Sequence, residues 1–402
     1  MNCGIIALFC CAQETKRGNI FMATITFKHT PFGDLALVSM RGCEDISEKV
    51  DYYLTQWRET PEGYSFIVPA VCPRFGTGEG KAVLNHTARG LDVYIICDCY
   101  NYGVTYNMYG QTVPMSPDDH FQDLKRVIAS LGGKARRITV IMPMLYEGRQ
   151  HRRTARESLD CAMALQELIS MGVSNIITFD AHDPRVQNAI PLGGFDNVQP
   201  TYQMIKALIK NVPDIVIDRD HMMIVSPDEG GMGRCIYFSS VLGLELGMFY
   251  KRRNYSVLVN GRNPIEAHEF LGKNINGKDL IIVDDMISSG ESILDIAAKL
   301  KEKGANRIFV FATFGLFVEG LDKFDEYYRK GLITRIFTTN LIYSNPELLK
   351  REWYCNVDMS KYIAYIVDTL NYDNSISGLL DPAERINNIM EKHIKELKEK
   401  KQ

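Results

Sequence analysis

Short apolar runs that end in polar residues recur along the whole chain. Residues 158–171, 233–246 and 292–303 separate several of these runs and repeat their apolar side chains at helical spacing. Strands that alternate with helices are typical of a parallel sheet with helices on its faces. We therefore predict an α/β fold with one or two mainly parallel sheets. The predicted strands end at Asp98, Pro143, Asp183, Asp228, Asp285 and Thr313.

The length of the chain, 402 residues, is too great for one ordinary domain and predicts two. A break in the pattern at 197–202, which contains Pro200, is the best candidate for the boundary. The alternation begins only after Met22, which is an alternative start to Met1. We expect a non-native or disordered extension, an N-terminal domain, a C-terminal domain and a charged helix at 1–21, 22–199, 200–381 and 382–402.

Charge and cysteine content exclude several classes of partner. The formal net charge is −3 and no basic tract is sustained, so nucleic acid is not expected as a partner. No apolar stretch reaches the length that spans a membrane, so no membrane partner is expected either. The ten cysteines are scattered, without the paired spacing of a zinc site or the disulfide framework of a small domain. This usage favours a reducing, cytoplasmic location.

The segment from Leu280 to Ile293 is the most informative part of the sequence. Its apolar start predicts a buried strand, and Asp284 and Asp285 follow at the end where open α/β sheets bind ligands. The N–H groups of the small loop and the helix dipole beyond it favour a phosphate, and the acids suit sugar hydroxyls, directly or through Mg²⁺. A strand with an acidic helix cap is the alternative, but the loop favours a site for a phosphorylated sugar. The loop residues are Ser288, Ser289, Gly290 and Ser292.

Two further clusters follow predicted strands. Asp180 and His182 could hold a Mg²⁺-nucleotide, although a lone histidine is more often structural. Four arginines lie just beyond another strand, and their planar groups suit phosphate oxygens and an adenine ring. A run of charge is usually a solvated surface, but the position beside a strand end favours function. The arginines are Arg149, Arg152, Arg153 and Arg156.

The second basic cluster, Lys251, Arg252 and Arg253, follows another predicted strand. It opens a long segment of little periodicity that continues through 262–272. Loops of this length are uncommon unless they are disordered or functional. An active-site lid would bring these cations to the substrate, where they would neutralise the charge that develops in phosphoryl transfer. The alternative is ordinary surface charge.

Taken in order, these segments resemble the ribose-phosphate pyrophosphokinase family, also called phosphoribosyl diphosphate synthetases. The resemblance covers about residues 35–386 and consists of several motifs in the right order, which makes it more specific than any one of them. The motifs are FGTGEGKAVLNHTARGLDVYII from Phe75, MPMLYEGRQHRR, ITFDAHDP, VSPDEGGMGR, YKRRN, VDDMISSGES, TTNLIYSNPE and SISGLLD.

The resemblance implies two similar phosphoribosyltransferase-type, Rossmann-like domains. It implies transfer of the β,γ-diphosphoryl group of ATP to the 1-hydroxyl of ribose 5-phosphate with Mg²⁺, which gives AMP and 5-phosphoribosyl 1-diphosphate. Members form dimers that assemble into larger rings, such as hexamers, and their sites draw on neighbouring subunits. The resemblance also assigns roles to residues by position. The residues that would bind ATP are Phe75, Glu79, Arg149, Gln150 and His182, and those that would bind ribose 5-phosphate are Asp284, Asp285, Ser288, Ser289, Gly290 and Ser292. The Mg²⁺ ligands would be His182, Asp228 and Asp180, and the catalytic residues Lys251 and Arg253.

The sequence departs from the family pattern at four residues and one insertion. In the sugar loop, Ser288 replaces a third acid, and Glu291 replaces a glycine, which would bring a carboxylate toward a phosphate unless it points outward. His151 replaces an acid, and Phe314 stands where histidine is usual. Residues 101–120, rich in Tyr, Gly and Pro, form an insertion near the nucleotide side. These changes weaken the inference of the acceptor's identity more than they weaken the inference of the reaction class.

Two other functions stay open on this sequence. One is a non-catalytic regulatory homologue that binds nucleotide and partners with an active synthetase, which the altered sugar loop motivates. The other is a phosphoribosyltransferase, or a diphosphokinase with a different acceptor, because the pattern Asp-Asp-x-x-x-Ser-Gly-x-Ser also fits that wider group. Phosphoribosyltransferases need only one such domain, so dependence on a nucleotide distinguishes these functions.

Overall fold

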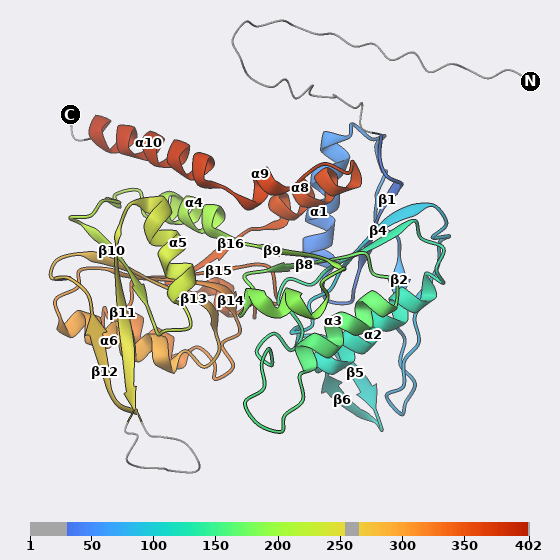
Figure 1. Ribbon diagram of the computed structural model, residues 1–402, viewed down its shortest axis with the longest axis horizontal. Helices are drawn as coiled ribbons and strands as arrows, with labels where there is room; N and C mark the ends of the chain where they lie inside the picture. Colours follow the sequence, from blue (N-terminus) through green and yellow to red (C-terminus); the bar gives the residue numbers. More distant parts are fainter. Residues whose placement is uncertain (1–29, 254–264, 401–402) are drawn as a thin grey trace, which may run out of the picture.

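The computed structural model of the chain describes residues 30–253 and 265–400, with only the backbone of 251–253 and 265–268. It contains two mainly parallel sheets, one built by the first half of the chain and one by the second (Figure 1). Helices flank both sheets. The prediction of an α/β fold is therefore confirmed, whereas the predicted extension at 1–21 lies outside the described residues.

The first sheet has five strands, and every neighbouring pair in it is parallel. Helices α1 (Glu44–Trp57), α2 (Pro117–Ser130) and α3 (Asp160–Ser170) connect or flank its strands. Parallel strands of this kind place all their carboxyl ends on one edge of the sheet. In spatial order the strands are β1 (Asp34–Ser39), β4 (Leu91–Ile96), β7 (Arg137–Ile141), β8 (Asn175–Phe179) and β9 (Gly194–Val198).

The second sheet has seven strands and is parallel except for the pair β11–β12 at one edge. Its flanking helices are α4 (Thr201–Asn211), α5 (Met232–Leu242), α6 (Glu291–Glu302) and α7 (Asp322–Arg329). In spatial order the strands are β12 (Ile265–Leu271), β11 (Glu245–Arg253), β10 (Met222–Ser226), β13 (Asp279–Ile287), β14 (Ile308–Gly315), β15 (Arg335–Thr339) and β16 (Tyr354–Val357).

Alternation along β13 decides which helices cover which face of the second sheet. Ile281 and Val283 belong to one hydrophobic cluster together with residues of α4 and α5. Leu280 and Ile282 belong to a second cluster together with residues of α6 and α7. Successive strand residues point to opposite faces, so a continuous apolar run buries both faces of the sheet at once. Asp284 and Asp285 follow this run at the carboxyl end of the buried strand segment.

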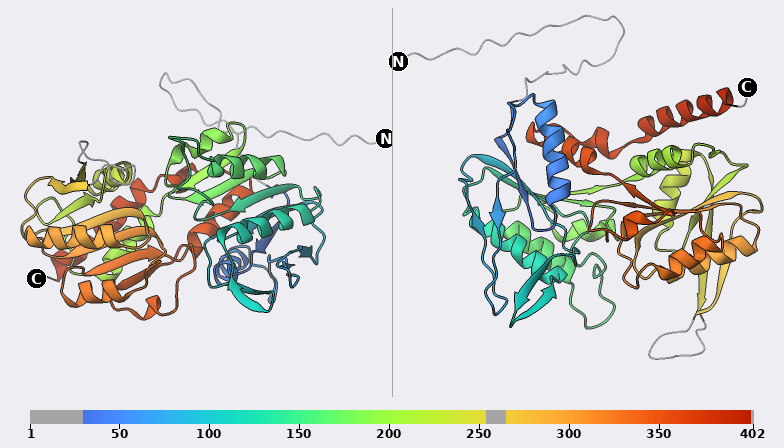
Figure 2. Two further views of the ribbon diagram at one scale, coloured as in Figure 1. Left: turned by 90° about the horizontal axis from the view of Figure 1, so that it is seen from below. Right: turned by 180° about the vertical axis from the view of Figure 1, so that it is seen from behind.

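The end of the chain returns to the first half of the molecule. Helix α8 (Ser360–Asn371) packs on α1 (Figure 2). The rings of Tyr365 and Trp57 stack there, with their centres 4.4 Å apart. Asn371 is buried and donates to Asp92 Oδ2 at 2.8 Å. A short helix α9 (Ser377–Leu380) leads to α10 (Ala383–Glu399), which is helical as predicted and lies against α4 and α5. The second half is thereby anchored on the first, while the boundary near residue 200 stays a prediction.

Three segments differ from the sequence-based expectation. The predicted helix 233–246 ends at Leu242, because Gly243 adopts a φ of 65° and β11 begins two residues later. The predicted insertion at 101–120 contains a hairpin of β5 (Thr105–Met108) and β6 (Gln111–Pro114). A second two-stranded sheet pairs β2 (Ala70–Val71) with β3 (Val83–Leu84). Where a loop was expected after Tyr250, the structure has the antiparallel strands β11 and β12. The residues that connect them, 254–264, lie outside the described residues.

The described helices were compared with the length and hydropathy that a membrane span requires. Among residues 30–253 and 265–400, no helix is both long and apolar enough to cross a bilayer.

Candidate functional site

The carboxyl ends of the two sheets meet, and a histidine from one contacts an aspartate from the other. His182 follows β8 of the first sheet, and Asp285 lies near the end of β13 of the second sheet. The distance from His182 Nδ1 to Asp285 Oδ2 is 2.6 Å. Ligand sites of open α/β sheets lie at such strand ends, so this contact marks the centre of the candidate site.

Asp180 forms a second connection between the halves. The Nε–H group of Arg234, on α5, lies 2.8 and 2.9 Å from the two Asp180 carboxylate oxygens. Thr313, at the end of β14, donates its hydroxyl to Oδ2 at 2.5 Å. Asp180 is buried and has a φ of 43°, an unusual conformation for a residue with a side chain. Its carboxylate therefore already has protein partners on both oxygens.

The ionisation of the pair at the centre follows from this geometry. The hydrogen bond to Asp285 raises the pKa of His182, although burial opposes it. Burial acts to raise the pKa of Asp285, but the hydrogen bond from His182 and the charge of Arg234 outweigh it and lower the value to about 2. Burial, together with the adjacent Asp285 charge, raises the pKa of Asp284 well above its ordinary value. The site thus holds one firmly ionised acid next to one that resists ionisation.

The loop after β13 has the geometry predicted for it. Gly290 precedes α6 with a φ of 84°, and a Cβ atom there would lie 2.1 Å from the Phe324 ring. Only glycine fits such a position. Ser288 and Ser289 are half-buried next to it, so the loop stays small and close to the start of α6. Backbone N–H groups at a helix start favour an anion.

Glu291 points away from this loop toward the surface. Its Oε1 atom lies 2.9 Å from Lys323 Nζ, on α7, and the Glu291 side chain is 62% exposed. The pair lowers the pKa of Glu291, which stays ionised there. The carboxylate that stands in place of a glycine in the predicted pattern therefore has a partner outside the loop that is predicted to bind phosphate.

Two cavities adjoin His182. The lining of the smaller cavity includes Arg149, His182, Asp285 and Phe314, so Arg149 lies beside the His182–Asp285 contact. The larger, of about 290 Å³, is lined by His182, by Gly230 of the loop that carries Asp228, and by Gly233 and Arg234 of α5. Asp228 turns that loop by accepting hydrogen bonds from the N–H groups of residues 230 and 231, at 2.9 and 3.2 Å.

Other predicted ATP-site residues lie elsewhere in this chain. Phe75 is 57% exposed on a loop whose Arg74 is held by Asp123 of α2 at 2.9 Å. Glu79 accepts from a threonine of the same loop at 2.9 Å. Gln150 donates to the carbonyl of residue 158 at 2.9 Å. None of the three lines the cavities at His182.

The predicted catalytic cations can be located only by backbone. Lys251 and Arg253 lie in β11, paired with residues 268 and 265 of β12. Their side chains lie outside the described residues. Their role stays a prediction.

The site also contains residues to which the sequence analysis assigned no role in it. Arg234 and Thr313 complete the Asp180 network, and His151 lies with its ring 5.3 Å from that of His182. His151 Nδ1 is buried and has no hydrogen-bond partner in the described part of the chain. Arg234 stands at the end of the motif VSPDEGGMGR, so its position in a strand-end motif was the available signal.

Within the described residues, no three His, Cys, Asp or Glu side chains are gathered as a metal-binding group. A cation held here would need oxygens from elsewhere. Mg²⁺ ordinarily binds in this way, through one or two carboxylates together with water and substrate phosphates.

Comparison with known proteins agrees with this geometry. Residues 35–172 match the N-terminal domain of ribose phosphate pyrophosphokinase, and residues 262–381 match the phosphoribosyl synthetase-associated domain. In fold the chain is similar to the crystal structure of phosphoribosylpyrophosphate synthetase from Mycobacterium smegmatis, with a TM-score of 0.69 and 19% identity over 85% of this chain and 100% of that one. The protein thus has the α/β fold of the phosphoribosyl diphosphate synthetases.

Curated relatives extend the likeness from fold to sequence. The ribose-phosphate pyrophosphokinase of Shewanella oneidensis is 29% identical over 314 residues, which are 77% of this chain and 90% of the relative. That of Ureaplasma parvum is 30% identical over 239 residues, which are 59% of this chain and 69% of the relative. The chain belongs to the ribose-phosphate pyrophosphokinase family, of which it is a divergent member.

Proposed function

We propose that this chain is an active ribose-phosphate diphosphokinase. It would transfer the β,γ-diphosphoryl group of ATP to the 1-hydroxyl of ribose 5-phosphate, giving AMP and 5-phosphoribosyl 1-diphosphate. The observation that carries the proposal is the 2.6 Å contact between His182 and Asp285, with Arg149 lining the same cavity. It joins residues of the ATP motifs to residues of the sugar-phosphate motif in one chain of this family.

In this proposal, ribose 5-phosphate binds to the end of β13 and the loop after it. Asp285 is ionised and buried, so it can accept hydrogen bonds from ribose hydroxyls. The N–H groups of the loop at Ser288, Ser289 and Gly290 and the start of α6 would bind the 5-phosphate. Because Glu291 pairs with Lys323, its charge does not oppose this phosphate.

In this proposal, ATP binds in the two cavities that His182 lines, one together with Arg149 and the other together with the loop that carries Asp228. Arg149 would contact the ATP phosphates or adenine, since its guanidinium suits both. Phe75 and Glu79 do not line these cavities within one chain, so we place them in the site of a neighbouring subunit. The protein would then act as a dimer-based homo-oligomer, and a lone subunit would be incomplete.

Mg²⁺ fits the donor set at this site. With His182 Nδ1 committed to Asp285, the other ring nitrogen is the atom that can bind a ligand, and the carboxylate orients the ring. His182 and Asp228 would hold the ion together with phosphate oxygens. When bound, Mg²⁺ would neutralise charge on the diphosphoryl group. Asp180 differs from its predicted role, because its oxygens are engaged by Arg234 and Thr313, and we give it the role of positioning Arg234.

The chemistry requires little beyond positioning. The attacking group is a sugar hydroxyl and the phosphate is already activated, so orientation and charge neutralisation supply most of the rate. Asp285 and the loop would orient the sugar, and Arg149 the nucleotide. Lys251 and Arg253, from β11, would neutralise charge that develops on the transferred group.

Product analysis tests this function. The purified chain is incubated with Mg²⁺, ATP and ribose 5-phosphate, and AMP and 5-phosphoribosyl 1-diphosphate are followed by mass spectrometry. We expect equal amounts of both products, and no AMP when ribose 5-phosphate is omitted. AMP without the second product, or neither product from a chain that binds ATP, would contradict the proposal.

A further inference from the structure

The hairpin of β5 and β6 packs against a loop that carries two residues of the predicted ATP site. The hairpin lies within the predicted insertion at 101–120. The loop, residues 74–80, is named the Phe75 loop and also contains Glu79. Because the Phe75 side chain is 57% exposed, the loop presents this ring to its surroundings and not to the core. Burial of Phe75 therefore does not fix the conformation of the loop.

The hairpin buries side chains on one face only. Along β5, Thr105 and Asn107 are exposed, whereas Tyr106 and Met108 are half-buried. Alternate residues of a strand point to the same face, so Tyr106 and Met108 share the buried one. An isolated two-stranded hairpin is at best marginally stable in water, so this face needs a surface to pack on.

The backbone of the Phe75 loop provides that surface. Gly78 has a φ of 93°, and a Cβ atom built on it would lie 2.8 Å from Met108 Sδ and 3.7 Å from the Tyr106 ring. A side chain at this position would have to displace Met108, and the positive φ disfavours one as well. The two half-buried side chains of β5 thus lie directly on the middle of the loop.

Two further contacts hold the base and the tip of the loop. At the base, the guanidinium of Arg74 lies 5.0 Å from the centre of the Tyr106 ring and pairs with Asp123 of α2 at 2.9 Å. At the tip, the N–H group of Tyr109, in the turn of the hairpin, donates to the carbonyl of Gly76 at 2.8 Å. The hairpin therefore contacts the loop at three points along its length.

The two predicted ATP residues of the loop are linked to each other. The N–H group of Phe75 donates to the carbonyl of Glu79 at 2.7 Å, and that of Gly78 donates to the carbonyl of Phe75 at 2.9 Å. These bonds join Phe75 and Glu79 in one turn. A contact that fixes Gly78 therefore also fixes both of them.

The hairpin is itself fixed to the first half of the molecule. Arg41 Nη2 donates to the carbonyl of Thr105 at 2.7 Å, and the buried side chain of Asn101 donates to the carbonyl of Gly42 at 2.9 Å. Nε2 of the buried His120, on α2, lies 2.8 Å from the Asn101 carbonyl oxygen. Arg41 and Gly42 follow β1, so the support of the Phe75 loop is tied to the first sheet.

We propose that the β5–β6 hairpin positions the Phe75 loop for ATP, with Tyr106 and Met108 as the positioning residues. This role rests on the proposed function, which places Phe75 and Glu79 at the ATP of a neighbouring subunit. A loop that is already held in its binding conformation loses less entropy when the ligand binds. The hairpin would therefore strengthen the binding of ATP and leave the binding of ribose 5-phosphate, at the end of β13, unchanged.

Calorimetric titration of the full chain with ATP tests the proposal, because it measures binding without turnover. In Tyr106→Ala/Met108→Ala, the ATP affinity should fall about five- to tenfold, since the loop then has to be ordered on binding. The KM for ATP should rise with it, whereas kcat at saturating ATP and the KM for ribose 5-phosphate should stay within about twofold of the wild-type values. Tyr106→Phe keeps the ring and should keep the wild-type affinity.

Removal of residues 105–114 is a second, independent variant. The N–H group of Met115 already donates to the carbonyl of Val104 at 2.8 Å, and both residues are buried. An Asn-Gly turn can therefore join them without disturbing the base of the hairpin. This shortened chain should lose at least as much ATP affinity as the double variant.

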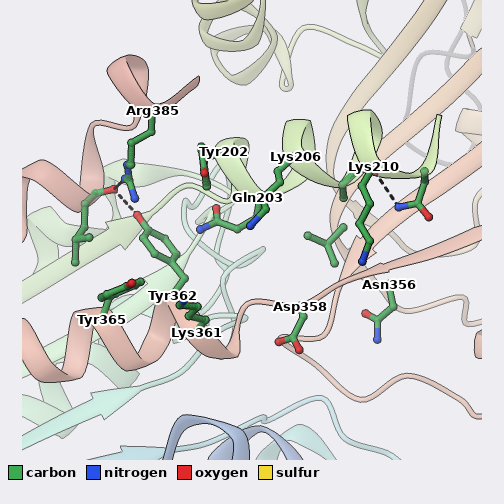
Figure 3. Close-up of a pocket in the computed structure, with 14 residues that line it drawn as sticks. Tyr202, Gln203, Lys206, Lys210, Asn356, Asp358, Lys361, Tyr362, Tyr365 and Arg385 are labelled. Atoms are coloured by element: carbon green, nitrogen blue, oxygen red, sulfur yellow. Dashed lines mark hydrogen bonds between the residues drawn. The ribbon is translucent and has the colours of Figure 1, made fainter. Parts of the chain in front are cut away.

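Tyr365→Ala is the control for a general loss of aromatic packing. Tyr365 is on α8 and lines a cavity between α4, α8 and the start of α10, where Figure 3 labels it. Its ring stacks on that of Trp57, so its removal also costs packing energy. Figure 1 shows α8 in the upper part of the molecule and the hairpin in the lower part, so this variant should bind ATP like the wild-type chain.

The outcomes are distinguishable. Equal ATP affinity of the double variant and the wild-type chain would overturn the proposal. So would a loss that accompanies a smaller oligomer mass in light scattering, or a loss that Tyr365→Ala or the KM for ribose 5-phosphate shares, because the effect would then be general. A wild-type chain that binds ATP without forming products would contradict the proposed function, and the binding comparison would still decide the role of the hairpin. A wild-type chain that binds no ATP would contradict both.

Discussion

His182 Nδ1 lies 2.6 Å from Asp285 Oδ2, although 103 residues separate the two in the chain. Each stands at the carboxyl end of a strand, one in each sheet. The contact fixes the histidine ring and keeps the carboxylate ionised. In the proposed reaction it sets the distance between the nucleotide and the sugar.

Replacing His182 should impair turnover without unfolding the protein. We expect His182→Ala to lower kcat about 100-fold, the size of effect seen when a group that orients a metal site is lost. Because the variant removes a hydrogen bond to the buried Asp285 carboxylate, Tm should fall somewhat, but the protein should still fold cooperatively. Steady-state kinetics and thermal unfolding check this, with His221→Ala as control, because His221 also pairs with an aspartate but lies at the surface. Equal kinetics of the two variants would remove His182 from the site.

Replacing the acids of β13 should act on the sugar more than on the nucleotide. The double variant Asp284→Asn/Asp285→Asn loses charge-assisted hydrogen bonds to hydroxyls, so its KM for ribose 5-phosphate should rise on the order of 10- to 100-fold. Its affinity for ATP should fall by a smaller factor, because Asp285 acts on the nucleotide side only through the ring of His182. Asp295→Asn, at an exposed position of α6, is the matched control. Equal losses for both substrates would mean that the sugar is placed wrongly.

Replacing Glu291 should be tolerated, in spite of its place in the sugar loop. Glu291→Gln removes the ion pair with Lys323, but the carboxylate points away from the phosphate-binding N–H groups. We expect the KM for ribose 5-phosphate to change less than about twofold. Glu319→Gln removes the other acid that pairs with Lys323 and serves as control. A tenfold fall in KM for Glu291→Gln alone would show that the native carboxylate repels the phosphate.

Replacing Lys251 tests the predicted lid. If its ammonium neutralises charge in the transition state, Lys251→Ala should lower kcat about 10³-fold and change ATP affinity little. Lys273→Ala is a suitable control, because Lys273 is an exposed lysine just after β12 that pairs with Glu245. An unchanged rate would exclude the lid from the mechanism.

Asp98 should make stability depend on pH. It accepts hydrogen bonds from the N–H groups of Tyr100 and Tyr343, but burial dominates and raises its pKa from 3.8 to about 6. The folded state therefore holds more protons than the unfolded state between these values, and stability falls as pH rises through this range, by about 3 kcal/mol in all.

Denaturation at several pH values checks this sign. Asp98→Asn cannot titrate, so its stability should lack this fall between about pH 4 and 6. A wild-type chain whose pH profile matches that of the variant would show that Asp98 titrates normally.

The places of the site residues in the fold could be predicted, but their contacts could not. The apolar runs before Asp180 and Asp285 indicate parallel strands, whose polar ends lie on one edge of a sheet. Periodicity within a strand fixes its two faces, but carries no information on how two sheets are arranged. The sequence pattern therefore could not predict the contact of His182 with Asp285, nor the pairing of Glu291 with Lys323 on α7.

Arg234 shows a second limit of sequence reasoning. It lies on a helix, where an arginine usually faces solvent, yet its side chain is only 11% exposed and pairs with Asp180 at the junction of the sheets. The helix boundary nearby was also wrong, because one glycine with positive φ ended α5 before the apolar pattern ended. Tertiary packing decided both features.

The formation of 5-phosphoribosyl 1-diphosphate and AMP by the purified chain, measured by mass spectrometry with Asp284→Asn/Asp285→Asn alongside, tests the central claim most directly. The account predicts both products in equal amounts from the wild-type chain, with a large loss in the variant at limiting ribose 5-phosphate. A wild-type chain that binds ATP but makes neither product would contradict it.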